Sequence, residues 1–199
     1  MHGGKNVKFK QFQFLKNEAI KKLTALEEEP LRLRKRTIEE CLSADAVMLA
    51  YIGDAVYSMY VRERVVQMNI TKVQILHTIV TEFICAKSQA KVLLEIENTF
   101  TEDEQAIARR ARNSNVNVPK SSTVQEYRSS TAFEAVLGFL YETRQDERLQ
   151  HILGQAFSIT LRGKPPASVL GACGFPDAPG GTPSALRAAG RVRSGCVVV

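Results

Sequence analysis

Two acidic residues stand out because each lies inside a segment that is otherwise apolar. Asp54 follows Gly53 in the segment YIGDAVY, and Glu134 lies in STAFEAVLGFLY. Charged side chains are rarely buried without a partner, and a glycine inside a helix costs about 1 kcal/mol relative to alanine. A hard divalent cation such as Mg²⁺ prefers oxygen ligands and keeps several waters, so it would explain both carboxylates. The two residues are therefore candidates for a metal-dependent catalytic site.

Each acid taken alone also has a simpler interpretation. Asp54 could face solvent, and Gly53 could merely let a second helix approach closely. Two such acids in one small domain are harder to explain in this way. If their helices pack together, Asp54 and Glu134 can converge on one cation although they are 80 residues apart in the sequence.

The spacing of apolar residues predicts the helices that must hold these acids. Residues 46–60 are apolar around most of a helix circumference, so this helix is expected to be central and buried, with Ser43 or Asp45 as its N-cap. Further helices are predicted from Thr71 to about Glu82, from Phe83 to Glu97, from Thr101 to the arginines ending at 112, near Val124, from Thr131 to Tyr141, and from Asp146 to about Ile159. Residues 113–123 are rich in Asn, Ser and Thr and are expected to form a loop. Without a strand pattern, the expected fold class is all-α, a bundle of helices.

Composition divides the 199 residues into one domain with two loose ends. Residues 1–42 are predicted to be an N-terminal helical extension, interrupted at Pro30. Residues 43–162 form the expected catalytic domain. Gly, Pro, Ala and Ser dominate after Arg162, so residues 163–199 are expected to be a disordered tail.

The charge balance favours a polyanionic partner, since 27 Lys and Arg stand against 21 Asp and Glu, a formal net charge of +6. No apolar run approaches the roughly 20 residues of a membrane span, and no secretory signal pattern is present. The four cysteines are far apart, without the spacing of metal ligands, and are interpreted as reduced thiols. The expectation is a cytoplasmic protein that does not associate with membranes.

The segments YIGDAVY, ICAKSQAKVLL and ARRARNSNVNVPKSSTVQEYRSSTAFEAVLGFLY, in that order and spacing, resemble Mini-ribonuclease III over roughly residues 44–160. The resemblance implies an all-helical ribonuclease III-type endonuclease domain, working as a homodimer, that hydrolyses double-stranded RNA with Mg²⁺. It also implies a role in maturing large-subunit (23S) ribosomal RNA precursors, with a ribosomal protein or the pre-ribosome as a further candidate partner. The family lacks a separate double-stranded-RNA-binding domain, and the residues after Arg162 are too few to form one.

By this resemblance, Asp54 and Glu134 are the catalytic and metal-binding residues. Larger ribonuclease III enzymes carry two further acids, where this chain has Ala50 and Thr131. Mini-III sequences share this reduction, so it indicates the subfamily and leaves the number of metal ions open. The implied chemistry is in-line attack by a metal-bound water, which leaves 5′-phosphate and 3′-hydroxyl ends.

A-form RNA is recognised mainly through phosphates, 2′-hydroxyls and shape, which suits Arg, Lys, Asn, Ser and Thr side chains. The predicted RNA-binding residues are Arg109, Arg112, Asn113, Lys120, Tyr127, Arg128, Ser130, Thr131, Lys87 and Gln89. Simpler interpretations remain for several of them. The arginines are also typical of a helix C-terminus, Tyr127 is also typical of a core, and AKSQAK could be an ordinary exposed helical turn.

Homodimer formation needs an apolar surface, and the residues around Tyr57, Met59, Tyr60 and Phe83 are candidates, although sequence alone does not separate an interface from the core. Two other functions stay open. The domain could have lost catalysis and serve as an RNA-binding or ribosome-associated protein, as Ala50 and Thr131 would suggest. It could instead be a helical protein-interaction module without an RNA partner.

Overall fold

The computed structural model describes residues 3–25, 34–114, 118–119 and 121–164. The chain divides into two compact units, Met1–Lys35 and Arg36–Val199, each considered by itself. In the first unit the helix α1 (Gly3–Ala25) exposes large apolar side chains, including Phe9, Phe12 and Phe14. The predicted domain boundary between residues 42 and 43 falls inside α2 of the second unit, and nearly all of the predicted tail lies outside the described residues.

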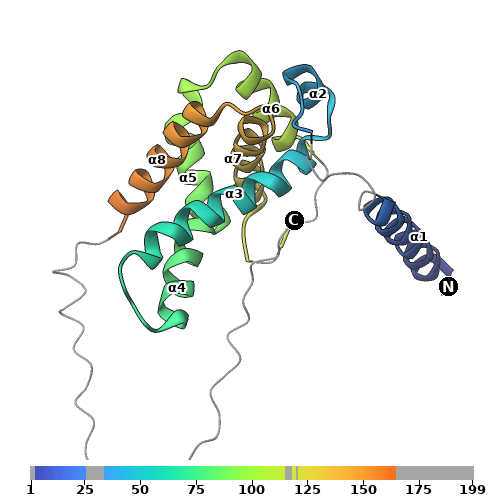
Figure 1. Ribbon diagram of the computed structural model, residues 1–199, viewed down its shortest axis with the longest axis horizontal. Helices are drawn as coiled ribbons and strands as arrows, with labels where there is room; N and C mark the ends of the chain where they lie inside the picture. Colours follow the sequence, from blue (N-terminus) through green and yellow to red (C-terminus); the bar gives the residue numbers. More distant parts are fainter. Residues whose placement is uncertain (1–2, 26–33, 115–117, 120, 165–199) are drawn as a thin grey trace, which may run out of the picture. The chain divides into compact units, whose positions relative to one another are not determined.

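The second unit is built from helices over its described residues, which confirms the predicted all-helical class (Figure 1). Its elements are α2 (Ile38–Ser43), α3 (Ala46–Val66), α4 (Val73–Ile84), α5 (Ala86–Ile96), the 3₁₀ helix η2 (Glu97–Thr99), α6 (Glu102–Arg112), α7 (Val124–Glu142) and α8 (Asp146–Arg162). In the part of the chain that is described, no helix combines the length and apolar character that crossing a membrane requires.

Local sequence signals explain where several helices begin. The side chain of Asp45 accepts a hydrogen bond from the backbone N–H of Val47 and caps α3, so Asp45 is the cap of the two that were predicted. Three other helices begin at a capping box, in which a threonine and a glutamate three residues later each accept the other's backbone N–H. The pairs are Thr37 with Glu40, Thr101 with Glu104, and Thr123 with Glu126.

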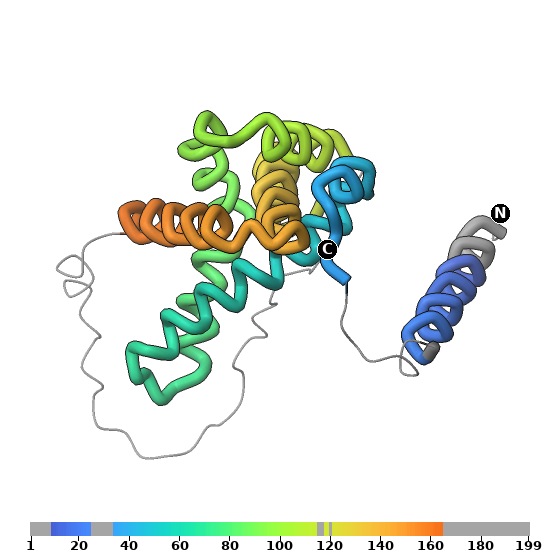
Figure 2. Tube along the Cα trace, turned by 45° about the horizontal axis from the view of Figure 1, so that its top comes forward, coloured from blue at the N-terminus to red at the C-terminus, as the bar shows by residue number. Residues whose placement is uncertain are grey.

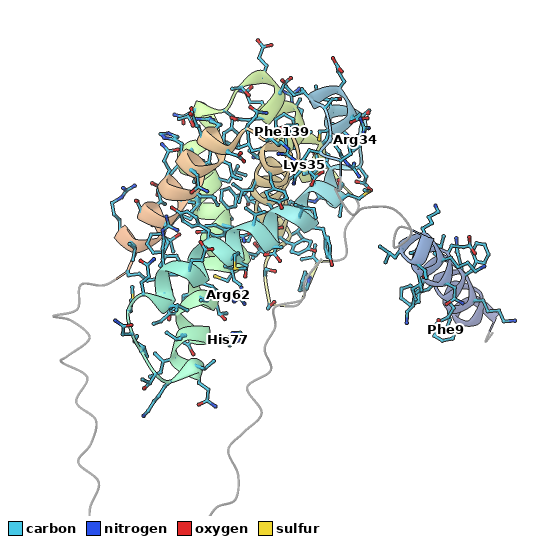
Figure 3. The ribbon with its side chains drawn as sticks, viewed as in Figure 1. Phe9, Arg34, Lys35, Arg62, His77 and Phe139 are labelled. Carbon is cyan, nitrogen blue, oxygen red and sulfur yellow. The ribbon has the colours of Figure 1, made fainter. Side chains whose placement is uncertain are left out.

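Helix α7 occupies the centre of the second unit, among α3, α5, α6 and α8 (Figure 2). Every residue from 130 to 140 is buried, and Phe139 lies among the side chains between the helices (Figure 3). Two separate helices were predicted between Val124 and Tyr141, and that prediction is wrong, because Val124–Glu142 forms one continuous helix.

The prediction that the helix from residue 46 is central and buried holds for only one of its faces. Helix α3 packs one face against α7 and exposes the other, where Met48, Tyr51 and Met59 remain between 50% and 60% accessible. The apolar residues of α3 therefore form two surfaces. One packs inside the domain, and the other faces outward. The central helix is α7 instead, because nearly all of its second half is apolar or small.

Two glycines allow α3 and α7 to meet backbone to backbone. A Cβ atom on Gly53 would lie 1.8 Å from the carbonyl oxygen of Glu134, and one on Gly138 would lie 1.9 Å from that of Leu49. No side chain fits at either distance. The contact fixes how α3 and α7 lie against each other, and it does so directly beside Asp54 and Glu134.

A buried ion pair joins α6 to α8. Arg148 donates from Nε and Nη2 to the two carboxylate oxygens of Glu104, each at 2.9 Å, and also donates to the carbonyl of Thr99 at 2.8 Å. Glu104 is 1% exposed, so its charge is compensated by a two-pronged partner as well as by its capping box. The ion pair between Glu104 and Arg148 holds α6 and α8 together beside α7.

Substituting alanine for Gly53 should destabilise the fold by about 1–3 kcal/mol or more, because the new methyl group would force the two backbones apart. Urea denaturation measures the free energy of unfolding. Gly154→Ala in α8 is the matched control, because its Cβ would meet only the Tyr60 hydroxyl, at 3.6 Å, and alanine has the higher helix propensity. The control should be neutral or stabilising, and equal effects at the two positions would contradict the backbone-contact interpretation.

Candidate active site

The structure brings Asp54 and Glu134 together at the contact between α3 and α7. Asp54 immediately follows Gly53, whose Cα faces the backbone of Glu134. Asp54 is half-buried and Glu134 is only 6% exposed. Gly53 therefore serves both roles considered for this segment. It lets the second helix approach closely, and that approach places Asp54 and Glu134 side by side.

Burial and mutual repulsion disfavour negative charge on this pair. Burial, followed by the neighbouring Asp54, raises the pKa of Glu134 well above its ordinary value of 4.5. Burial also raises the pKa of Asp54, and the guanidinium of Arg62 partly offsets that rise. Arg62 is exposed on α3, two helical turns beyond Asp54, and sequence reasoning did not single it out (Figure 3). Two apposed carboxylates with raised pKa values indicate a site that a cation would stabilise.

Gln89 on α5 is an uncharged polar residue that acts on Glu134 of the acid pair. It is fully buried, and its side-chain amide lies close enough to Glu134 to lower the pKa of that carboxyl, although the two groups are not in hydrogen-bonding geometry. Neither Nε2 nor Oε1 of Gln89 has a hydrogen-bond partner. A buried amide without a hydrogen-bond partner is uncommon in native proteins. Because this amide lies beside Glu134, we associate Gln89 with the acid pair.

Ala50 and Thr131, which stand where the resemblance places further acids in larger enzymes, are both buried and carry no charge. Ala50 is buried, and the hydroxyl of buried Thr131 donates to the carbonyl of Tyr127 at 2.9 Å. The described residues contain no group of three or more His, Cys, Asp or Glu side chains placed to hold a metal.

The donor set nevertheless fits a hard divalent cation. Asp54 and Glu134 supply carboxylate oxygens, and the unpartnered amide oxygen of Gln89 lies in the same region. Mg²⁺ typically binds through one or two carboxylates and fills its other positions with water and substrate phosphate. Two carboxylates are therefore sufficient for one such ion.

The predicted RNA-binding residues fall into two groups by exposure. Arg109, Asn113, Arg128 and Lys87 are exposed, and Arg112 is half-buried. Gln89, Tyr127, Ser130 and Thr131 are buried in the core and do not offer the surface that RNA contact requires. Lys120 lies outside the described residues. The exposed residues are therefore the members of the predicted set that lie where RNA could contact them.

A polar pocket of about 450 Å³ collects three of these residues between α5, the end of α6 and the start of α7. Arg112, Asn113 and Arg128 line it, together with Gln125 and Ser129, which were not predicted as site residues. Arg112 forms an ion pair with Glu97 at 2.5 Å, whereas Arg128 lies six residues before Glu134 on the same helix. The pocket gathers side chains that suit a phosphate-bearing ligand.

The candidate interface residues prove to be mostly core. Tyr57 packs edge-on against Phe133, and Phe83 stacks on Phe157, so Tyr57, Tyr60 and Phe83 are buried and only Met59 is exposed. Three exposed apolar side chains lie instead on the outer face of α3, those of Met48, Tyr51 and Met59. We call these three residues the outer stripe. Beside it, a mostly apolar pocket of about 390 Å³ is bordered by Arg36 and Glu142.

Comparison with known proteins shows which family this chain is similar to. Residues 47–145 match the family model described as the ribonuclease III domain. Curated relatives named Mini-ribonuclease 3 include one from Thermoanaerobacter sp. (strain X514), 43% identical over 118 residues that cover 59% of this chain and 83% of that protein. Another, from Symbiobacterium thermophilum, is 39% identical over 62% of this chain and 95% of that protein. A crystal structure of a Fusobacterium nucleatum protein aligns with a TM-score of 0.55 and 29% identity, covering 61% of this chain and 94% of that one.

Replacing Glu134 by glutamine should stabilise the metal-free protein at neutral pH. Folding raises the pKa of Glu134, so the native state binds the proton more tightly than the unfolded chain. The free energy of unfolding of the wild type therefore falls as pH rises from about 4.5 through the raised folded-state pKa, and glutamine escapes this loss. Urea denaturation in a chelator, from about pH 4 to about pH 8, should show the advantage of Glu134→Gln growing with pH.

Glu126→Gln is the control with the opposite expectation. Hydrogen bonds from Thr123 lower the pKa of this exposed carboxyl, so its ionised form stabilises the fold above the unfolded pKa. The glutamine variant should lose stability at neutral pH and approach the wild type in acid. A pH-independent difference for Glu134→Gln would contradict the desolvated acid pair.

Proposed function

Because the chain belongs to the Mini-ribonuclease 3 family of ribonuclease III-type endoribonucleases, we propose that it cleaves double-stranded RNA at the pair formed by Asp54 and Glu134. The observation that carries the proposal is the convergence of these two acids at the glycine contact between α3 and α7. Among the described residues, no ion pair neutralises either acid. The guanidinium of Arg62 offsets only part of the rise in the pKa of Asp54. Glu134 faces a second acid and the unpartnered amide of Gln89.

The roles of the residues follow from their positions. Asp54 and Glu134 would hold Mg²⁺, which would supply a Lewis acid and lower the pKa of a water molecule. The apolar walls of α3 and α7 limit the access of bulk water, which strengthens every electrostatic interaction at the pair. The glycine contact holds the backbones that carry the two carboxylates close together. The expected products carry 5′-phosphate and 3′-hydroxyl ends.

Exposed cations near the start of α7 are proposed to bind the RNA backbone. Arg128 is exposed and Arg112 and Asn113 line the same pocket, while Lys87 is exposed at the start of α5. Arg109 is exposed on α6. These residue types suit phosphate and 2′-hydroxyl contacts along an A-form duplex, which carry little sequence information.

A homodimer is the proposed assembly, and the outer stripe of α3 is its proposed interface. Exposed large apolar residues grouped along one helix face commonly mark an interaction surface. A two-fold dimer pairs the same patch with itself and matches the pseudo-symmetry of a duplex, with one acid pair for each strand. Asp54 lies on the same helix as the stripe, so dimer formation would place the two active sites at a fixed spacing.

The proposed substrate is a large-subunit ribosomal RNA precursor (23S), processed in the cytoplasm, with a ribosomal protein or the pre-ribosome as a further partner. The family assignment supports this role, and the formal charge of +6 suits a polyanionic substrate.

Cleavage of a generic duplex RNA tests the function. The wild type should cut it with Mg²⁺ and not with a chelator. Asp54→Asn and Glu134→Gln should each lower kcat by more than about 100-fold, because losing a metal ligand costs more than losing a residue that supports one. RNA affinity should change little in either variant, and it should fall steeply with salt in all three proteins.

Two outcomes would redirect the assignment. Duplex binding without cleavage by the wild type would favour the catalytically silent RNA-binding function that Ala50 and Thr131 suggest. Absence of salt-dependent RNA binding would favour the protein-interaction module.

Substituting lysine for Met59 should shift the dimer towards monomer and lower cleavage at dilute enzyme concentration. Met59 is 60% accessible, so the substitution removes an apolar contact between copies without disturbing the core. Sedimentation across a concentration series measures the assembly. Leu161→Lys on α8 serves as the control, since Leu161 is 47% exposed and belongs to a different helix from the outer stripe. A wild type that is monomeric at every concentration would overturn the proposed dimer.

A further inference from the structure

Gln89 is the polar exception on the buried face of α5. The other buried residues of this helix are Val92, Leu93 and Ile96, all aliphatic, and they pack where α5 lies against α7. Leucine or methionine has nearly the size of glutamine and would continue this apolar face. The chain instead places an amide there, with both polar atoms buried and without a hydrogen-bond partner.

An orphaned buried amide is unfavourable for folding, because both atoms lose water and gain no partner. A residue of this kind in a native structure calls for an explanation such as a catalytic role or an ion. The group next to the Gln89 amide is the carboxyl of Glu134, whose pKa it lowers. The position of the unexplained amide therefore coincides with the acid pair.

We propose that Gln89 is a positioning residue for Glu134. On small rotation, Nε2 of Gln89 can donate a hydrogen bond to one carboxylate oxygen of Glu134, which leaves the other oxygen to face the cation shared with Asp54. Oε1 of Gln89 then faces the same region and can accept a hydrogen bond from a water there. The sequence had suggested Gln89 as an RNA contact, but the side chain is 0% exposed.

A neutral partner suits this location better than another acid. Asp54 and Glu134 already repel each other in a desolvated site, and a third carboxylate would add to that repulsion. The amide can orient a carboxylate and a water without adding charge. Supporting groups of this kind typically contribute about 10- to 100-fold to metal affinity or activity. The inference rests on the proposed metal-dependent cleavage and deepens it.

The test compares the wild type with Gln89→Leu and Gln89→Met by titration with Mn²⁺ alone, with free Mn²⁺ followed by electron paramagnetic resonance. Both variants should bind Mn²⁺ about 10- to 100-fold more weakly than the wild type. In cleavage assays kcat should fall, while KM for duplex RNA stays unchanged because the residue does not reach the surface. The melting temperature without metal should stay the same or rise, because the orphaned amide is gone.

Val92→Ala is the packing control on the same buried face of α5. It should lower the melting temperature and leave Mn²⁺ affinity unchanged. Variants of Gln89 that bind Mn²⁺ as tightly as the wild type and cleave with the same kcat would overturn the positioning role while leaving the nuclease intact. A wild type that neither binds Mn²⁺ nor cleaves would overturn the proposed function itself.

Discussion

The backbone contact between α3 and α7 is the constraint on which the rest of the structure depends. Gly53 faces the carbonyl of Glu134, and Gly138 faces that of Leu49, four residues away on each helix. Such a reciprocal arrangement allows one register only, because any shift along either helix would bring a side chain into the contact. Since Asp54 adjoins one glycine and Glu134 lies one turn before the other, the register that packs the core also assembles the acid pair.

The acid pair is unfavourable for stability, and the surrounding framework compensates for it. Burial raises the pKa of both acids, repulsion by Asp54 adds to the rise at Glu134, and the nearby amide of Gln89 has no hydrogen-bond partner. Around this region the buried face of α7 is almost entirely apolar, three helices begin at capping boxes, and the pair of Glu104 with Arg148 joins α6 to α8. Both polar atoms of the Gln89 side chain lack a hydrogen-bond partner beside the acids where chemistry is proposed, and local exceptions of this kind are typical of functional sites.

Sequence patterns predicted those features that depend on local chemistry. Asp54 and Glu134 were recognisable because they interrupt apolar helices, and Asp45 and Thr101 because they are good N-caps. Features that depend on which helix packs against which were not predictable. Periodicity showed that α3 is apolar all round but could not separate the side facing α7 from the outer stripe, and it gave no sign that Gln89 turns inward. The break expected within α7 did not occur because burial on every side supports one continuous helix.

Backbone contact also affects which substitutions the domain can accept over evolution. Catalytic groups must be held within about 0.5 Å of their working geometry, and a separation set by packed side chains drifts whenever one of those side chains changes size. Between Gly53 and Gly138 the spacing is set by main-chain atoms, which are the same in every sequence. A change of side-chain size elsewhere in the core can therefore leave the spacing between the two helix backbones that carry Asp54 and Glu134 unchanged.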